Sequence, residues 1–192
     1  MGFENQSPKW TFVFIGISVI AFIIQQTTTL WRALAFFPSL AFRAPWMFVT
    51  SIFLHANLSH LFFNMFALFF VGIYLERMVG RRTFFTIFLT SGIIGNLGYL
   101  VTASNPQVPA IGASGAVYGV MGALAVIAPF LLVYVYGFLP LPMILVAVLY
   151  GLADFAGLFV PSGIANGAHL GGMFVGASYG VYLRRIARRI TV

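Results

Sequence analysis

Long uncharged stretches of apolar residues constrain this chain more than any other feature of its sequence. Several of them reach about 18 residues, the length that an α-helix needs to cross roughly 30 Å of hydrocarbon. Of the 192 residues, 61% are hydrophobic and only 7% are charged, whereas soluble domains carry roughly 25% charged residues. The sequence therefore predicts an all-α membrane protein whose chain crosses the bilayer several times.

Polar, proline-containing breaks divide the apolar stretches into six predicted transmembrane helices, which we expect to form one bundle within residues 11–185. The expected spans are residues 11–26, 57–75, 83–102, 114–128, 141–159 and 166–183. Residues 27–56 are rich in aromatic side chains and are interrupted by prolines and arginines, a composition typical of a membrane–water interface. We therefore expect a long first loop that lies partly in the interface. A short lead (1–10) and a short basic tail (186–192) flank the bundle.

The distribution of charge predicts the orientation of the helices. Lys9 and nine arginines oppose three acids and give a net charge of +7. The arginines cluster after the second and sixth spans, so the positive-inside rule places both termini in the cytoplasm of a multi-pass cell-membrane protein. This placement at helix ends favours contact with the bilayer over contact with nucleic acid. Spans two, four and six then begin in the external half of the membrane, near His60, Ser114 and His169.

Ser114 lies in the sequence Gly112-Ala113-Ser114-Gly115, at the predicted start of the fourth span. Glycine allows close backbone approach, and the unpaired N–H groups of a helix start favour developing negative charge. Taken alone, however, the tetrapeptide is explained more simply as an ordinary helix cap with glycines for helix packing.

His169 begins a face of small residues on the sixth span. Glycines follow it at +3, +7 and +11, and the fourth span has a similar face; the glycines concerned are Gly172, Gly176 and Gly180, and Gly115, Gly119 and Gly122. Such faces let membrane helices pack closely, which would bring Ser114 and His169 together at one end of the contact. A histidine with its ordinary pKa can accept a serine proton at neutral pH. The alternative is a histidine that serves only as a polar anchor.

His60 and Asn64 are spaced i, i+4 on the second span and share one face. Both can donate hydrogen bonds, as an oxyanion hole requires, where one lost donor costs roughly 2.7–4 kcal/mol of transition-state stabilisation. Interhelical hydrogen bonding is the alternative role. His55 precedes this span and could brace its loop.

Two further residues bear on the expected Ser–His pair. Tyr118 follows Ser114 by one helical turn and could orient the imidazole by stacking. Asp154 lies where the fifth span ends, so we expect a Ser–His dyad without an acid.

Other catalytic groups do not fit the residues present. A Ser–Lys dyad needs a buried lysine, but Lys9 is the only one, and no His-Glu-x-x-His zinc motif occurs. The chain has no cysteine, which excludes disulfides and thiolate ligands. The histidines could still bind a metal together, but no carboxylate stands beside them in the sequence.

Three motifs together resemble the rhomboid family of intramembrane serine proteases. The residues from His55 to Asn64 resemble its His-x4-His-x3-Asn motif, and Gly112 to Gly115 its Gly-x-Ser-Gly motif. The sequence from Ala168 through His169 and Gly172 to Gly176 is similar to its last-helix pattern. Tyr118 stands at the position of the family's stacking tyrosine, and the resemblance covers about residues 11–185.

The resemblance implies an intramembrane serine endopeptidase with Ser114 as nucleophile and His169 as general base. His60 and Asn64, with a backbone N–H near Ser114, would stabilise the oxyanion. It further implies transmembrane protein substrates, an active site that opens to the external side, and no metal or nucleotide. A channel or transporter with a polar path, an inactive rhomboid-like binder and a membrane scaffold remain the alternatives.

Overall fold

Helices occupy each of the six predicted segments in the computed structural model, which describes residues 7–135, 137–160 and 163–190 and the side chains up to residue 186. The ends of the chain, residues 1–6 of the predicted lead and 191–192 of the predicted tail, lie outside the described residues. The helices are α1 (Trp10–Thr27), α4 (Leu58–Ala67) continued through the π-helical turn η3 (Leu68–Gly72) into α5 (Ile73–Val79), α6 (Arg81–Thr102), α7 (Ser114–Ile127), α8 (Met143–Gly157) and α9 (Asn166–Ile190).

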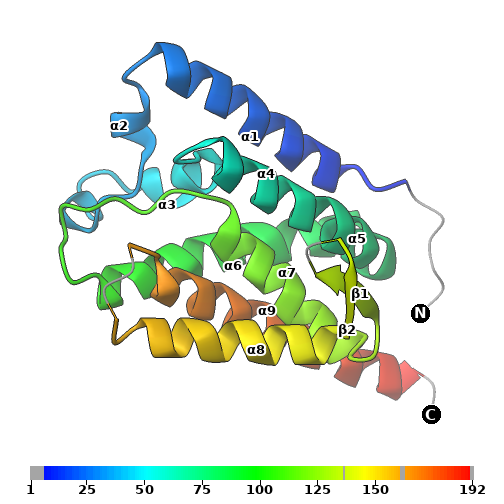
Figure 1. Cartoon of the computed structure of the whole chain (residues 1–192). Coiled ribbons are helices and arrows are strands. Elements are labelled where there is room, and N and C mark those ends of the chain that lie inside the picture. Colours follow the sequence, from blue (N-terminus) through cyan, green and yellow to red (C-terminus); the bar gives the residue numbers. More distant parts are fainter. Residues whose placement is uncertain (1–6, 136, 161–162, 191–192) are drawn as a thin grey trace.

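Three of these helical segments, Trp10–Thr27, Leu58–Val79 and Arg81–Thr102, are long and apolar enough to cross a membrane. The helices α7 and α8 are apolar but shorter. The structure thus supports a helical, membrane-embedded protein, while the count of six spans stays a prediction. Both α7 and α9 run from left to right in Figure 1, so their first residues lie at the same end of the molecule.

Residues 28–57 join α1 to α4 through four short helical turns: α2 (Trp31–Leu34), η1 (Pro38–Leu40), α3 (Met47–Thr50) and η2 (Ser51–Phe53). Phe36, Ala41, Ala44 and Met47 from this segment form a small buried cluster with Ala110. Phe36 and Ala110 also exchange two backbone hydrogen bonds, of 3.1 and 2.9 Å. The segment is therefore attached to the stretch of chain that leads into Ser114.

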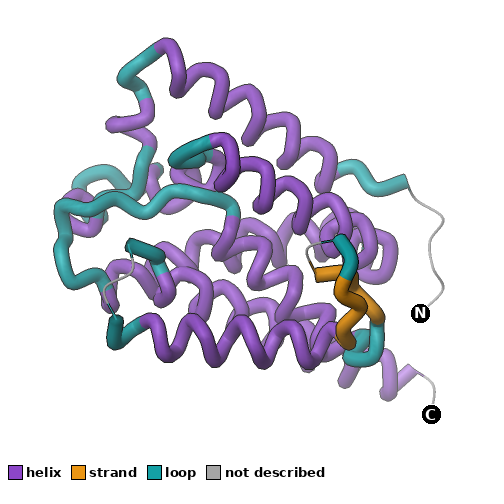
Figure 2. Tube along the Cα trace, viewed as in Figure 1, coloured by secondary structure: helices purple, strands orange, loops and turns teal. Residues whose placement is uncertain are grey.

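An antiparallel hairpin connects α7 to α8, which the purely helical prediction misses. Its strands are β1 (Leu132–Val135) and β2 (Leu139–Pro142), drawn in orange in Figure 2. Proline cannot donate to a strand ladder. Successive backbone nitrogens of a strand point to alternate sides, and the N–H of Met143 donates to the carbonyl oxygen of Leu131 at 2.8 Å. The nitrogens of Pro140 and Pro142, which lie opposite Tyr134 and Leu132, therefore face away from β1. The prolines also stop the chain from continuing as helix, and α8 begins only at Met143.

The helix α7 lies at the centre of the bundle, with almost all of its residues from Gly115 to Ala125 buried. Its closest neighbour is α9. A Cβ atom at Gly172 would overlap the carbonyl oxygen of Gly115, and one at Gly176 would overlap that of Gly119. Glycine at these positions therefore allows the two backbones to touch.

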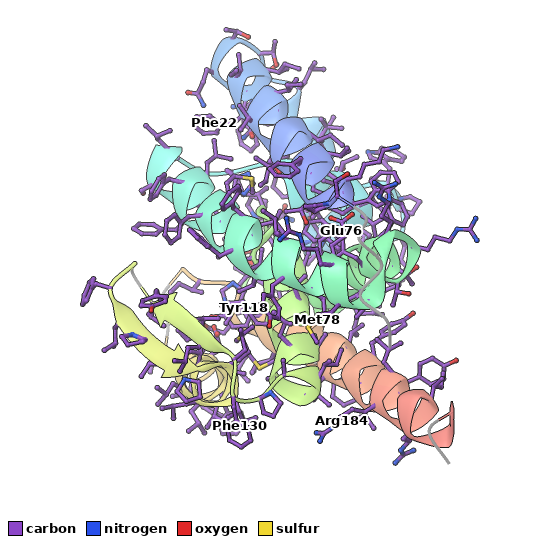
Figure 3. The ribbon with its side chains drawn as sticks, turned by 90° about the vertical axis from the view of Figure 1, so that its right-hand side faces the viewer. Phe22, Glu76, Met78, Tyr118, Phe130 and Arg184 are labelled. Atoms are coloured by element: carbon purple, nitrogen blue, oxygen red, sulfur yellow. The ribbon has the colours of Figure 1, made fainter. Side chains whose placement is uncertain are left out.

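The carboxylate of Glu76, in the middle of α5, binds the start of α1; Glu76 is labelled in Figure 3. It accepts the backbone N–H groups of Lys9, Trp10 and Thr11, each at 2.9 Å, and the Thr11 hydroxyl at 2.8 Å. A helix start leaves its first N–H groups unpaired and favours a nearby negative charge. Glu76, which is 2% exposed, is therefore fully engaged in fixing α1.

Candidate active site

Ser114 is the first residue of α7, and the loop before it is fixed by two backbone donors. The N–H of Gly112 donates to the carbonyl oxygen of Ser51 at 2.9 Å, and the N–H of Ala113 donates to Nε2 of His55 at 3.4 Å. Gly112 has φ +128°, a conformation that glycine adopts readily and other residues resist. The loop thus needs glycine at position 112 to present the serine.

Ser114, His169 and Asp154 form one chain of hydrogen bonds. The Oγ of Ser114 lies 2.8 Å from Nε2 of His169, and Nδ1 of the same ring lies 2.8 Å from Oδ1 of Asp154. The His169 and Asp154 side chains are only 13% and 7% exposed. With the carboxylate accepting from Nδ1–H, the neutral ring carries a lone pair at Nε2, where it can accept the serine proton.

The contact with Asp154 overturns the expectation that no acid stands beside the Ser–His pair. Asp154 lies three residues before the end of α8, and His169 lies three residues after the start of α9. Because a short connection makes successive helices antiparallel neighbours, residues at equal distances from the turn face each other. One signal in the sequence could have identified Asp154: an ionisable residue inside an apolar helix is a functional candidate by default.

Tyr118 packs flat against the imidazole of His169. The ring centroids are 4.3 Å apart and the ring planes differ by 15°. Tyr150, on α8, contacts the Tyr118 ring edge-on, with the ring centroids 6.0 Å apart. Figure 3 shows Tyr118 between the surrounding helices, near the centre of the molecule. The stacking predicted from sequence is thus present in the structure, and it restricts the rotation of the histidine ring.

His60 lies beside the loop that carries Ser114. A Cβ atom built on Gly112 would be 2.9 Å from Nε2 of His60 and 3.8 Å from Oγ of Ser114. Nδ1 of His60 accepts the N–H of Ala56 at 3.4 Å, so the proton of the neutral ring is on Nε2. This N–H group therefore faces the space beside the serine.

Asn64 follows His60 by one turn of α4 and is buried. Its amide nitrogen donates to the carbonyl oxygen of His60 at 2.8 Å. His55 is 1% exposed, and its ring centroid lies 5.2 Å from that of His60. Burial, with the charge of His60 as a smaller cause, lowers the pKa of His55 to about 4. His55 is therefore neutral at pH 7 and can accept the Ala113 N–H.

A small cavity of about 20 Å³ lies next to Ser114, and Asn96 is among its lining residues. A volume of this size holds one water molecule when polar groups line it.

In the parts of the chain that the structure describes, no group of three or more histidine, aspartate or glutamate side chains could hold a metal ion.

These features define a class of protein: a helical membrane protein in which hydrogen bonds link a serine to a histidine and the histidine to an aspartate. Comparison with known families identifies the class more closely, since the model of the Rhomboid domain matches residues 43–186. The match covers most of the chain, which therefore belongs to the rhomboid family.

Individual relatives agree with this assignment. The chain is 36% identical over 134 residues to Rhomboid protease GluP of Bacillus subtilis, covering 66% of this chain and 26% of the relative. It is 30% identical over 197 residues to the mitochondrial Rhomboid protein 1 of Saccharomyces cerevisiae, covering 97% of this chain and 57% of the relative. It is also 39% identical over 79 residues to Inactive RHOMBOID-like protein 8 of Arabidopsis thaliana, covering 41% and 22%. The chain thus spans between about a quarter and a little over half of these relatives' lengths.

Proposed function

We propose that this chain is an intramembrane serine endopeptidase that hydrolyses peptide bonds at or near the transmembrane segments of membrane-protein substrates. The observation that carries the proposal is the 2.8 Å contact between Ser114 Oγ and His169 Nε2, because a nucleophile and its base must lie within hydrogen-bond reach. Membership of a family in which several relatives are named proteases supports the same function.

In the proposed reaction, Ser114 Oγ attacks the scissile carbonyl carbon while its proton passes to Nε2 of His169. The resulting oxyanion accepts hydrogen bonds from the His60 Nε2–H, from the Asn64 amide and from a backbone N–H at the start of α7. His169 then gives the proton to the leaving amine, and the acyl-enzyme forms. His169 then takes a proton from a water molecule, whose oxygen attacks the ester carbon. The new carboxyl end is released, and His169 returns the proton to Ser114 Oγ.

Asp154 and Tyr118 act on this reaction through His169. The carboxylate of Asp154 fixes the proton at Nδ1, and it stabilises the imidazolium that forms when Nε2 takes the serine proton. The ring of Tyr118 holds the imidazole plane. Both are positioning residues, so their loss should lower turnover more than substrate binding.

We further propose a six-span bundle over residues 11–185, with both termini cytoplasmic and the site opening toward the external side. The length of α7 supports a site within the membrane. Its 14 residues extend about 21 Å, less than the roughly 30 Å of a hydrocarbon core. In the proposed bundle Ile127 is set at the cytoplasmic boundary, which would put Ser114 about 10 Å below the external boundary, where the end of a transmembrane substrate helix could unwind.

Cleavage of a transmembrane reporter in liposomes tests the proposal. Wild type should cut the reporter, and Ser114→Ala should not. Ser178→Ala is a matched control, because the Ser178 hydroxyl donates only to the α9 carbonyl of Phe174, at 2.8 Å, so this variant should cut like wild type. If all three proteins cut equally, another nucleophile is at work. Reporter binding without cleavage by wild type would favour an inactive binder, and solute flux through the liposomes would favour a transporter.

A further inference from the structure

A second concave site lies at the opposite ends of α7 and α9 from Ser114 and His169. It has a volume of about 210 Å³ and is lined by Val126, Val181, Arg184 and Arg185. We refer to these four residues as the arginine pocket. Its lining combines two valines with two arginines, and both arginines are exposed.

One arginine of the pocket is held in place by the end of α7. Nη1 of Arg184 donates to the carbonyl oxygen of Val126 at 3.1 Å, and Figure 3 shows Arg184 beside the end of that helix. The last carbonyl groups of a helix have no partner within the helix, so this bond satisfies one of them. A guanidinium has five N–H donors, and one of those of Arg184 makes this bond. The pocket is therefore partly preformed.

The arginine pocket lacks a counter-ion from the described part of the chain. Only two acids occur there, and both are engaged elsewhere. The Glu76 carboxylate accepts the N–H groups that start α1, and Asp154 pairs with His169. Two neighbouring arginines without a carboxylate repel each other and favour binding of an anion from outside.

We propose that the arginine pocket binds the phosphate of an anionic phospholipid. A guanidinium matches a phosphate in geometry and charge, and basic pockets at the cytoplasmic ends of membrane helices suit lipid headgroups. The two valines favour a lipid as the source of the phosphate, because they offer an apolar surface to the start of an acyl chain, which a free phosphate ion does not use. The pocket bridges α7 and α9, so a bound lipid joins the far ends of the two helices that carry Ser114 and His169.

Thermal unfolding of the detergent-purified chain, titrated with a short-chain phosphatidylglycerol, tests this proposal. The lipid should raise the unfolding temperature of wild type saturably, and the Arg184→Gln/Arg185→Gln variant should bind it at least tenfold more weakly. Arg77→Gln/Arg82→Gln is the matched control, because it removes two exposed arginines from the same end of the molecule but outside the pocket. This control should respond like wild type.

Equal responses in all three proteins would overturn the proposal, since they indicate diffuse charge attraction. A rise of the same size with inorganic phosphate would also contradict it, because the site would then take a free anion. Short-chain phosphatidylcholine should have little effect. If the double arginine variant does not fold, Val181→Trp fills the pocket and keeps both charges, and lipid binding as tight as wild type in that variant would refute the site. Ser114→Ala should bind the lipid normally, so the outcome does not depend on protease activity.

Discussion

The close contact between α7 and α9 makes a strong prediction for Gly172→Ala. A Cβ atom at this position would overlap the Gly115 carbonyl oxygen and lie 2.7 Å from its carbon. These are backbone atoms and cannot rotate away, so α9 must shift by about 1 Å, at a cost of about 1–3 kcal/mol of stability. Gly115 is the residue after Ser114, and His169 precedes Gly172 by less than one turn. The shift therefore acts directly on the 2.8 Å distance between Ser114 Oγ and His169 Nε2.

A misplacement of about 1 Å between reacting groups costs roughly 100-fold in rate, and this is the loss of kcat that we expect for Gly172→Ala. The assay is reporter cleavage in liposomes, with thermal unfolding measured on the same preparations. Gly16→Ala is the matched control, because a Cβ atom at Gly16 would meet nothing within 4 Å; it should keep wild-type activity. If Gly172→Ala cleaves the reporter within twofold of wild type, the glycine contact does not set the geometry of the site.

Three further predictions concern residues around His169 and Ser114. Asp154→Asn should lower kcat by about 10²–10⁴-fold with little change in KM, because the imidazole loses the partner that fixes its proton; a kcat within twofold of wild type would show that His169 works without the acid. Tyr118→Leu removes the stacked ring, whereas Tyr118→Phe keeps it. The kcat of the leucine variant should be roughly fivefold lower than that of the phenylalanine variant, which corresponds to about 1 kcal/mol of activation free energy. Equal kcat values would rule out a role for stacking. The lowered pKa of His55, about 4 against 6.5, means that below pH 6.5 the unfolded chain binds a proton that the folded chain does not. The free energy of unfolding should therefore be fully retained above pH 6.5 and should fall by up to about 3 kcal/mol as the pH drops to 4; His55→Gln should show a shallower pH dependence, and an unchanged slope would contradict this.

Ser114 and His169, the proposed nucleophile and base, could be singled out from the sequence because both lie in recognisable local patterns. Ser114 stands between glycines at a helix start, and His169 begins a row of glycines with helical spacing. Those rows indicate which helix faces meet, and the structure does bring α7 and α9 together along them.

Asp154 could not be placed in the same way. Its contact with His169 depends on how tightly the chain turns between α8 and α9, and neither glycine spacing nor hydrophobicity reports the geometry of that turn. The bond between Ala113 and His55 is similar, since it joins two loops that are far apart in the sequence.

The hairpin between α7 and α8 shows a second limit of sequence patterns. Residues 128–142 are almost uniformly apolar, so their hydrophobicity alone does not distinguish buried helix from strand. Pro140 and Pro142 argue against helix, but they are also ordinary at helix boundaries. Only the register of the hairpin, which sets Pro140 opposite Tyr134 and Pro142 opposite Leu132, shows that both prolines belong to a strand.

Labelling with a fluorophosphonate tests the central claim most directly, because this reagent reacts far faster with an activated serine than with an ordinary hydroxyl group. Peptide mapping of the purified, folded wild-type chain should place the label on Ser114, and His169→Ala should lose the labelling while remaining folded. Label on a different serine, or a folded wild-type chain with an unreactive Ser114, would contradict the proposed nucleophile and base.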